Sequence, residues 1–501
     1  MPTSFILCPS QALTPKKLVE LVKHYDKLAL SDLAWETIQQ AHSEFKKIVE
    51  SGTPIYGETT GFGPFVQHLS GQVGHKHARH LLAHLGAGSG AETPDEVVRA
   101  AMILRLNTLT QGHSGTSPEV VGLYLKILTD GYVASVPITG SVGASGDLIP
   151  MASIAGLLAG YGKATKDGET LDGLIVQKAL GLQADPFLYG RDALSLVNCT
   201  SYSTAWAILA LERGKKLLAD SEISTAVLMA QLGARQSSLD PRLHEARGQI
   251  GQIKSAENIR NWLNEFGAKE DETRELQEVY SIRCVPQILG ACRDQLAYSE
   301  EILKREMNGV DDNPLTFEYD QNQPESGVAH GGNFFAQHVA FTSDAINSAL
   351  TQIGILVERQ LDLMVTPSKT DNWPLLLSWE VGSMSGLAGV QIGASALLAE
   401  MRAQSQQYAN TSIPTNAGNQ DIVPMAANAA RQAYEQTQRL AVLIASLTIA
   451  FSQVNALKEA EKITGKVIPI PNELPSFDKI DEDRPLRDEL SIAAAKLLDI
   501  G

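Results

Sequence analysis

The sequence of 501 residues predicts a mainly α-helical protein, a long-helix bundle with a smaller mixed N-terminal domain. Two observations lead to this fold class. Long segments rich in Ala, Leu and Ile carry apolar residues at helical spacing, with polar residues mainly at their ends. Strand-like stretches are few and short. Helices that are apolar on most faces belong in the middle of a large bundle or at a subunit interface.

The first clear helix follows Ser31, a candidate N-cap, with Asp32 in its first turn, and it stops at Gly52 and Pro54. Its apolar residues share one helical face: Leu33, Ile38, Ala41, Phe45 and Ile48. Longer helical patterns cover residues 193–232, 286–307, 332–364, 385–406 and 426–462. Strands are expected only at residues 132–138 and 467–470.

These patterns divide the chain into two expected domains. Residues 1–200 form the mixed N-terminal domain, and residues 201–501 form the long-helix bundle. Polar connections are expected at residues 165–190 and 319–326. The tail at residues 469–485 is rich in Pro and charge, and we expect it to wrap the surface.

Charge and composition exclude several classes of partner. The net charge is −16 and the sequence contains no basic block, so neither nucleic acid nor an anionic membrane is expected. Four scattered cysteines do not form a disulfide framework, and the N-terminus lacks the pattern of a signal peptide. The longest apolar stretch, residues 440–451, falls short of the ~20 residues that span a bilayer. These features predict a cytoplasmic protein.

The segment GSVGASGDLIP at residues 140–150 is the most informative in the chain. A short strand, then Gly140, Gly143 and Gly146, then a predicted helix resembles a dinucleotide-binding turn. However, the spacing is G-x-x-G-x-x-G rather than G-x-G-x-x-G, and no alternation of strands and helices follows. Small residues also permit unusual backbone angles, which a backbone cyclisation requires.

Ala144-Ser145-Gly146, flanked by Gly143 and Asp147, resembles the segment that aromatic amino-acid ammonia-lyases and aminomutases cyclise. In that family the Gly amide nitrogen attacks the Ala carbonyl, and loss of two waters leaves 4-methylideneimidazol-5-one (MIO). The resemblance covers about residues 53–458 and is closest in motif to bacterial tyrosine ammonia-lyases. It implies a fumarase/aspartase-like helical core, an MIO formed without metal or nucleotide, and a homotetramer whose active sites draw on three subunits.

The segment YGETTGFG, which opens at Tyr56, resembles the mobile inner loop of the family with its catalytic tyrosine. The proton to be removed from the β-carbon of the substrate is barely acidic. A phenol with a reference pKa of about 10 gives a stronger base than a carboxylate, provided that its surroundings lower that pKa. Glycines in this segment would let the loop open and close.

Further segments resemble the rest of the family's pocket. The resemblance implies catalytic roles for Asn198 and Tyr280 and a carboxylate clamp at Arg283, whose guanidinium matches a carboxylate in two parallel hydrogen bonds. It also implies substrate contacts from Leu148, Gln277, Asn313, Phe334, Asn416 and Gln420. Two positions depart from the family pattern: Cys199 stands where glycine is common, and Glu278 stands where aspartate is usual.

His84-Leu85 resembles the His-Leu selectivity pair of tyrosine ammonia-lyases, whereas phenylalanine-preferring relatives commonly carry Phe-Leu and histidine-preferring ones Ser-His. An imidazole can pair with a phenolic hydroxyl while Leu85 packs the ring. His75, His77, His80 and His84 could instead suggest a metal site. No HExxH motif and no carboxylate at helical spacing accompany them, so we expect no metal.

The resulting hypothesis is an ammonia-lyase that converts L-tyrosine to p-coumarate and ammonia. Several alternatives remain open on the sequence alone. They are a tyrosine 2,3-aminomutase that gives β-tyrosine, a phenylalanine or histidine ammonia-lyase, a dinucleotide-dependent oxidoreductase built on the 140–146 turn, and a non-catalytic relative.

Replacing Ser145 by Ala is expected to abolish activity, because the variant cannot form the ring that supplies the electrophile. The measurement is the absorbance of the product released by the purified Ser145→Ala protein, with the wild-type protein as reference. A clearly active Ser145→Ala enzyme would contradict the assignment of residues 144–146.

Overall fold

The computed structural model describes residues 5–67, 75–370 and 373–500; Met1–Ser4 of the N-terminal segment and the side chain of His75 lie outside the described residues. The protein is mainly helical, as the sequence predicts, and its strands are short. The chain divides into two compact units, each made of three chain segments. Unit 1 comprises residues 1–209, 300–343 and 407–431, and unit 2 comprises residues 210–299, 344–406 and 432–501.

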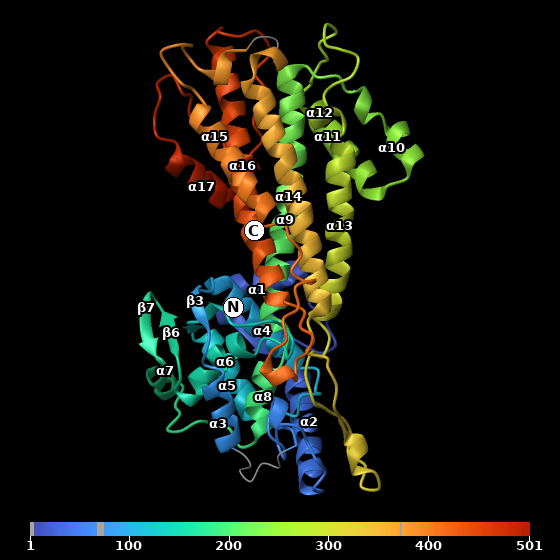
Figure 1. Cartoon of the computed structure of the whole chain (residues 1–501), viewed down its shortest axis with the longest axis vertical. Helices are drawn as coiled ribbons and strands as arrows, with labels where there is room; N and C mark the ends of the chain where they lie inside the picture. Colours follow the sequence, from blue (N-terminus) through green and yellow to red (C-terminus); the bar gives the residue numbers. More distant parts are fainter. Residues whose placement is uncertain (1–4, 68–74, 371–372, 501) are drawn as a thin grey trace. The chain divides into compact units, whose positions relative to one another are not determined.

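Unit 1 is a mixed unit of short helices and small sheets (Figure 1). Its helices are α1 (Pro15–Lys23), α2 (Asp32–Glu50), α3 (His75–His84), α4 (Asp95–Leu109), α5 (Pro118–Thr129), α6 (Leu148–Ala155), α7 (Gly173–Ala179) and α8 (Gly190–Val197). Its strands are β1 (Phe5–Leu7), β2 (Leu28–Leu30), β3 (Ser89–Glu92), β4 (Val133–Ala134), β5 (Pro137–Thr139), β6 (Lys163–Lys166), β7 (Glu169–Asp172), β8 (Leu315–Thr316) and β9 (Val328–Ala329). β1 and β2 pair in parallel, whereas β3–β5, β4–β6–β7 and β8–β9 are antiparallel.

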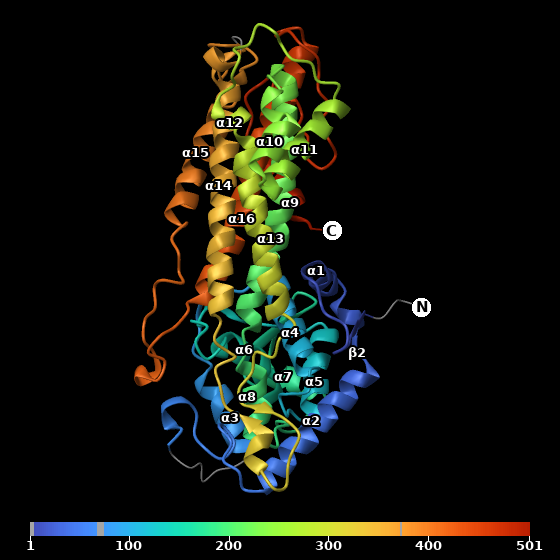
Figure 2. The ribbon, with the colours of Figure 1, turned by 90° about the vertical axis from the view of Figure 1, so that its right-hand side faces the viewer.

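Unit 2 is a bundle of long helices that run side by side in Figures 1 and 2. Four helices contribute residues to both units: α9 (Ser201–Leu232), α13 (Val285–Glu306), α14 (Gln337–Val365) and α16 (Ala426–Glu459). The others are α10 (Pro241–Arg247), α11 (Ile250–Glu265), α12 (Tyr280–Arg283), α15 (Ala388–Ala403) and α17 (Arg487–Leu498).

Small and polar residues allow the long helices of unit 2 to pack closely. A Cβ on Gly214 of α9 would lie 3.2 Å from Leu350 of α14, so the two helices meet at a glycine. The amide of Gln436 in α16 donates to the carbonyl oxygen of Met401 in α15 at 2.9 Å. Such buried amides are tolerated in an apolar bundle because their donors find partners.

Several local predictions are wrong. Strands form outside the two predicted stretches, and β7 and α7 lie within residues 165–190, which were predicted to be a polar connection. Two further errors have the same physical cause. The helix predicted at residues 193–232 is interrupted at residues 198–200, between α8 and α9. There the side chain of Asn198 and the backbone N–H of Thr200 bond to other segments instead of continuing a helix. Residues 467–470 form no strand, because the backbone N–H and C=O of Ile468 pair with the side-chain amide of Asn455.

The strand predicted at residues 132–138 is two short strands, β4 and β5, which pair with β6 and β3 respectively. Between them, the N–H of Ser135 donates to Lys163 and the carbonyl of Val136 accepts from Thr93. The predicted N-cap of α2 is confirmed, since the hydroxyl of Ser31 accepts from the N–H of Ala34 at 3.1 Å.

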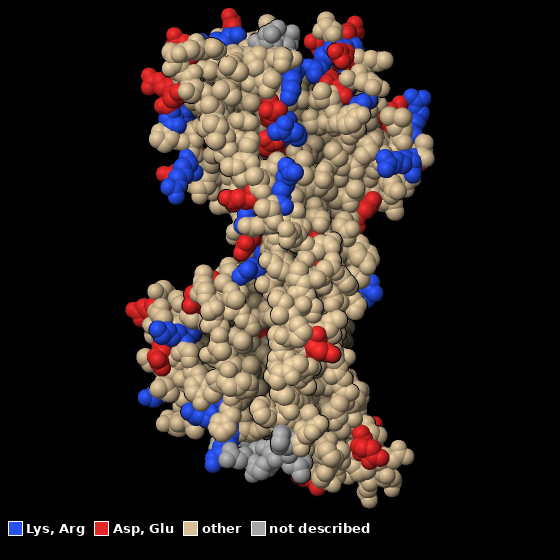
Figure 3. Space-filling model, in the orientation of Figure 1, with Lys and Arg blue, Asp and Glu red and all other residues tan. Residues whose placement is uncertain are grey.

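Two apolar stretches, Gly190–Leu232 and Ala426–Glu459, are long and apolar enough by length and composition to cross a membrane. Their most apolar windows are 100% and 89% buried inside the protein, which is the pattern of core helices. On the face drawn in Figure 3, acidic and basic side chains are interspersed. The negative net charge is therefore not gathered into one patch on that face.

Candidate active site

The segment that the sequence singles out lies in unit 1, between β5 and α6, and is pressed against the chain that joins α8 to α9. The backbone N–H of Asp147 donates to the carbonyl oxygen of Cys199 at 2.7 Å. Gly146 has φ +72°, and a Cβ there would lie 2.4 Å from the oxygen and 2.5 Å from the nitrogen of Cys199. Only glycine fits this position, because both the positive φ and the backbone contact exclude a side chain.

Asn198 holds the middle residue of the segment. It is 2% exposed, and its amide nitrogen donates to the carbonyl oxygen of Ser145 at 2.7 Å. Its amide oxygen is buried and has no hydrogen-bond partner among the described residues. A buried acceptor without a donor is costly, so this oxygen is suited to receive an N–H or O–H from a bound molecule.

Four helices of unit 1 begin next to the segment: α6, α9, α14 and α16. The N–H of Ala336, just before α14, donates to Gly143 at 3.1 Å, and the N–H of Met425, just before α16, donates to Val142 at 2.9 Å. Helix N-termini carry partial positive charge. Their convergence would stabilise negative charge placed at residues 144–146.

The carboxylate of Asp147 anchors the segment through hydrogen bonds. It is fully buried and accepts from the hydroxyls of Ser141 and Ser203 at 2.6 Å each, and from the N–H of Ser203 at 2.7 Å. Burial raises the pKa of Asp147 to about 6, although these donors favour the ionised form.

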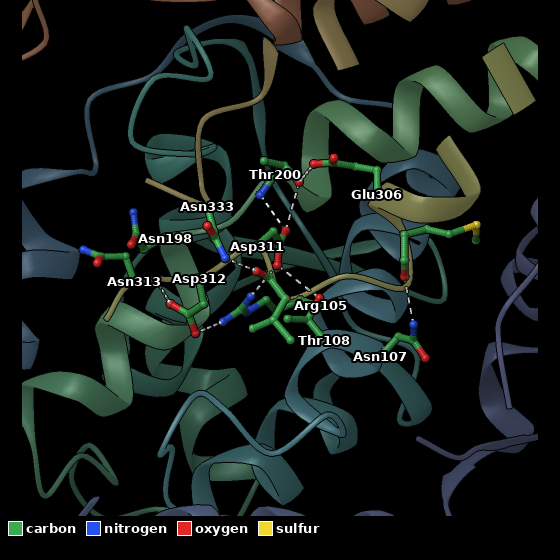
Figure 4. Close-up of polar contacts among 12 residues, drawn as sticks. Arg105, Asn107, Thr108, Asn198, Thr200, Glu306, Asp311, Asp312, Asn313 and Asn333 are labelled. Atoms are coloured by element: carbon green, nitrogen blue, oxygen red, sulfur yellow. Dashed lines mark hydrogen bonds and ion pairs between the residues drawn. The ribbon is translucent and has the colours of Figure 1, made fainter. Parts of the chain in front are cut away.

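A network of buried charges that includes Arg105 of α4 supports the site (Figure 4). The guanidinium of Arg105 donates to Asp311 at 3.0 Å and to Asp312 at 2.7 Å, and Arg191 lies 2.6 Å from Asp312. Burial opposes ionisation of Asp312, but the guanidiniums of Arg191 and Arg105 outweigh it and lower the pKa of this carboxyl. Asp312 is therefore ionised between the two guanidiniums inside the unit.

This network positions two segments of the site. Asp311 accepts from the N–H of Thr200 at 2.7 Å, next to the Asn198–Cys199 contact. Asp312 accepts from the N–H of Asn313 at 2.7 Å, and Arg191 donates to the carbonyl oxygen of Asn313 at 2.8 Å. The amide oxygen of Asn313 in turn accepts from Gly331, so it is committed to holding the loop that precedes Phe334.

The Tyr56 loop is closed on itself and lies against two other site segments. The phenol oxygen of Tyr56 accepts from the N–H of Gly63 at 2.8 Å. The backbone N–H of Tyr56 donates to Nε2 of His330 at 3.1 Å. A Cβ on Gly63 would lie 2.6 Å from the amide nitrogen of Asn416. Unit 1 therefore brings together three segments that are distant in sequence: the Tyr56 loop, the segment HGGNFF at residues 330–335 and the segment TNAGNQ at residues 415–420.

The pKa of Tyr56 differs from the expectation of a lowered value. Burial raises it, and the N–H of Gly63 lowers it only partly. Because burial raises the pKa of Tyr56 further from neutrality, the phenol is protonated at neutral pH in this arrangement. The described contacts do not provide the lowered pKa that a base needs at this position.

The remaining candidate residues of unit 1 lie as follows. Leu148 is the first residue of α6, and Leu148 and Phe334 are both half-buried. The hydroxyl of Thr415 donates to the amide oxygen of Gln420 at 2.5 Å. Leu85 is buried, whereas His84 is exposed at the end of α3, with its Nδ1 3.0 Å from the carbonyl oxygen of His80.

Three candidate residues, Gln277, Tyr280 and Arg283, lie in unit 2, where they line a pocket of about 520 Å³. The Arg283 guanidinium lies 4.7 Å from the ring centroid of Tyr280, which is 67% exposed. Glu278, the departure from the family pattern, is an ion-pair partner of Arg274 at 2.6 Å. Unit 2 therefore presents a cation and a phenol together.

Within the described parts of the chain, no group of three or more His, Cys, Asp or Glu is placed to hold a metal ion. His77 has a different role. Its ring stacks on Phe62 at 4.2 Å between centroids, and its Nε2 lies 3.1 Å from the carbonyl oxygen of Thr60. It therefore holds the Tyr56 loop against α3.

Sequence reasoning missed the supporting residues Asp147, Arg105, Arg191, Asp311 and Asp312. The adjacent acidic pair Asp311-Asp312, in the segment NGVDDNPLTF at residues 308–317, was the one visible signal, since acidic residues beside apolar ones need buried cations. Nothing near Arg105 or Arg191 in sequence indicates which carboxylates they meet.

Comparison with known proteins assigns the family. The model of the family described as aromatic amino acid lyase matches residues 13–469. The chain belongs to this family. This aromatic amino acid lyase is 34% identical over 468 residues to a histidine ammonia-lyase of Yersinia enterocolitica, covering 92% of this chain and 90% of the relative.

Two further relatives bear on the chemistry. A tyrosine ammonia-lyase of Cupriavidus metallidurans is 34% identical over 444 residues, covering 84% of this chain and 82% of the relative. The solved structure of a tyrosine aminomutase from Streptomyces globisporus superposes with a TM-score of 0.86 at 27% identity, covering 99% of this chain and 97% of the other. The chain is thus an enzyme of an ammonia-lyase family. This family assignment excludes the alternative of a dinucleotide-dependent oxidoreductase.

The residues present fit the MIO that the family implies. The surroundings of Gly146 leave no room for a side chain, and the amide nitrogen of Asn198 holds the Ser145 carbonyl. The amide oxygen of Asn198 has no hydrogen-bond partner among the described residues. Converging helix N-termini supply the positive potential that a conjugated electrophile needs.

Replacing Gly146 by Ala should prevent MIO formation, because the new Cβ meets the Cys199 backbone at 2.4 Å. We expect activity to fall by about 100-fold or more, together with loss of the near-ultraviolet absorbance of the ring. Gly162→Ala is the matched control: its φ is also +72°, yet the nearest atom to its Cβ is 3.9 Å away. Equal activity of the two variants would contradict the steric account.

Proposed function

We propose that this enzyme deaminates L-tyrosine to p-coumarate and ammonia. The pair His84-Leu85 carries the substrate assignment. The exposed ring of His84 has its Nδ1 engaged at the end of α3, which leaves Nε2 available to pair with the phenolic hydroxyl of a substrate. Leu85, buried beside it, would pack against the aromatic ring.

The remaining residues divide the chemistry between them. Arg283 holds the carboxylate of the substrate, and Tyr280 and Asn198 donate or accept hydrogen bonds near the amine. Tyr56 takes the β-proton. The MIO formed from Ala144, Ser145 and Gly146 supplies the electrophile that activates the amine. Burial raises the pKa of Tyr56 within a single chain. To act as a base, Tyr56 therefore needs nearby positive charge, which the described contacts do not supply.

We further propose a homotetramer with shared active sites. Gln277, Tyr280 and Arg283 belong to unit 2, and in the complete site they come from a neighbouring subunit. Arg283 would then supply positive charge beside Tyr56. Exposed apolar side chains on the helices, such as Phe341 at 58% and Ile392 at 67%, support such an interface. Four free cysteines fit a reducing, cytoplasmic setting.

A second candidate, histidine deamination, is favoured by the names of most of the similar curated relatives, at 31% to 35% identity. The His-Leu pair argues against it, because it places the imidazole one residue earlier than the Ser-His of histidine-preferring relatives. The tyrosine aminomutase fold neighbour favours retention of the product and a β-amino acid outcome.

The deciding experiment incubates the purified protein separately with L-tyrosine, L-phenylalanine and L-histidine. Absorbance reports p-coumarate, cinnamate or urocanate, and chromatography reports β-amino acids. We expect p-coumarate as the dominant product. Urocanate or cinnamate would overturn the tyrosine assignment, and β-tyrosine would make the enzyme an aminomutase.

Substituting His84 by Phe should raise the preference for phenylalanine over tyrosine by about 10- to 100-fold in kcat/KM. The substrate hydroxyl would then be buried without a partner, at a cost of ~1–3 kcal/mol. His80→Phe is the matched control, one turn earlier on α3 and exposed, and it should leave the preference unchanged. An unchanged preference in His84→Phe would remove His84 from the substrate pocket.

A further inference from the structure

Glu58, the third residue of YGETTGFG, is a fully buried carboxyl to which the proposed function gives no role. Its Oε2 accepts from the backbone N–H of Arg191 at 3.1 Å and also faces the N–H of Gly190. These are the first N–H groups of α8, which have no partners within the helix. Its Oε1 is buried and has no hydrogen-bond partner among the described residues.

The residues on either side of Glu58 pack on the same helix and on α3. A Cβ on Gly57 would lie 2.7 Å from the side chain of Leu194 in α8. Further along the loop, Phe62 stacks on His77 of α3, which also lies within hydrogen-bond distance of Thr60. Glu58 is thus the one acidic side chain through which the Tyr56 loop bonds to α8.

The other end of α8 carries a residue of the reaction centre. Asn198 is the C-cap of this helix and donates to the carbonyl oxygen of Ser145. At ~1.5 Å per residue, the eight residues of α8 span only about 12 Å. Arg191, bound to Asp312 and Asn313, fixes the helix in place. α8 is therefore a short, firmly held helix that contacts Glu58 at its N-terminus and the segment that carries Ser145 at its C-terminus.

We propose that Glu58 is a positioning residue that fastens the Tyr56 loop to the N-terminus of α8, and that its protonation sets how firmly the loop is held. This inference rests on the proposed function only for the role of Tyr56 as the base. The contacts of Glu58 do not depend on the substrate.

Four groups with titratable or charged side chains face Glu58 or its immediate contacts: Tyr189, Arg191 and Asp192 at the start of α8, and His77 of α3. Burial is the main cause that raises the pKa of Glu58 to about 7, and the charge of Asp192 adds to it. The N–H groups of Arg191 and Gly190 and the Arg191 guanidinium act in the opposite direction. Burial lowers the pKa of His77, which keeps this imidazole neutral at neutral pH.

The direction of the pH effect follows from this raised pKa. The docked loop binds a proton more tightly than an open loop, in which the Glu58 carboxyl has its ordinary pKa of 4.5. Docking is therefore strongest at low pH, weakens as pH rises, and stops changing once Glu58 is ionised in both states above about 7. Between about pH 6 and about pH 8 the docking equilibrium should weaken about tenfold.

Hydrogen exchange of the loop amides tests this without any substrate. Protection factors of residues 55–63 are measured at about pH 6 and about pH 8, with each rate divided by the intrinsic rate at that pH. We expect the wild-type protection to fall about tenfold, as the docking equilibrium does. Glu58→Gln keeps the acceptor oxygen but cannot ionise, so its protection should be the same at both pH values and higher than that of the wild type at each. Glu58→Ala should lower protection at both pH values.

Asp220→Asn is the matched control, because burial also raises the pKa of Asp220, to about 6, while its partner is Lys216 in unit 2. It should show the wild-type pH effect on the loop. A pH-independent wild-type loop, or a Glu58→Gln loop that loses protection like the wild type, would overturn the proposal. Absence of p-coumarate with the expected exchange pattern would instead refute the tyrosine assignment alone.

Discussion

Two stretches of backbone, at Gly146-Asp147 and at Asn198-Cys199, lie in direct contact with no side chain between them. This contact fixes the carbonyl of Ser145 against Asn198 and leaves glycine as the only residue that fits at position 146. It also interrupts the helix that would otherwise join α8 to α9, which lets α9 begin beside the segment. α6, α14 and α16 also begin at the same segment, so helix N-termini surround it. The backbone contact therefore fixes the shape of the segment and also places it in positive electrostatic potential.

The contact is held by buried charges rather than by apolar packing alone. Arg105 and Arg191 pair with Asp311 and Asp312, and these carboxylates bond to the backbone at Thr200 and Asn313. Removing one partner of such a buried pair typically costs ~3–5 kcal/mol, because the other charge is left unpaired. These residues therefore hold the 144–146 segment firmly, as self-cyclisation of the backbone would require. The Tyr56 loop, by contrast, is held by stacking, single hydrogen bonds and the buried Glu58, which would suit the mobile loop that the proposed function expects.

The sequence predicts the long helices well, because apolar periodicity is a local signal: α16 begins at Ala426, as expected, and α13 begins within one residue of its predicted start. It fails where side chains replace backbone partners, as Asn198 and Asn455 do. The site motifs could be recognised by resemblance. Their support could not, since Arg105 meets Asp311 across 206 residues of chain and looks, in sequence, like an ordinary helical cation. The pKa of Tyr56 also depends on burial, which no motif encodes.

The central claim is that this chain modifies its own backbone at residues 144–146. Mass spectrometry of the purified protein tests it directly, first on the intact chain and then on the peptide that contains residues 140–150. The account predicts a mass lower than that of the sequence by two water molecules, with the whole difference in that peptide. A peptide of unmodified mass, from protein that is otherwise folded, would contradict it.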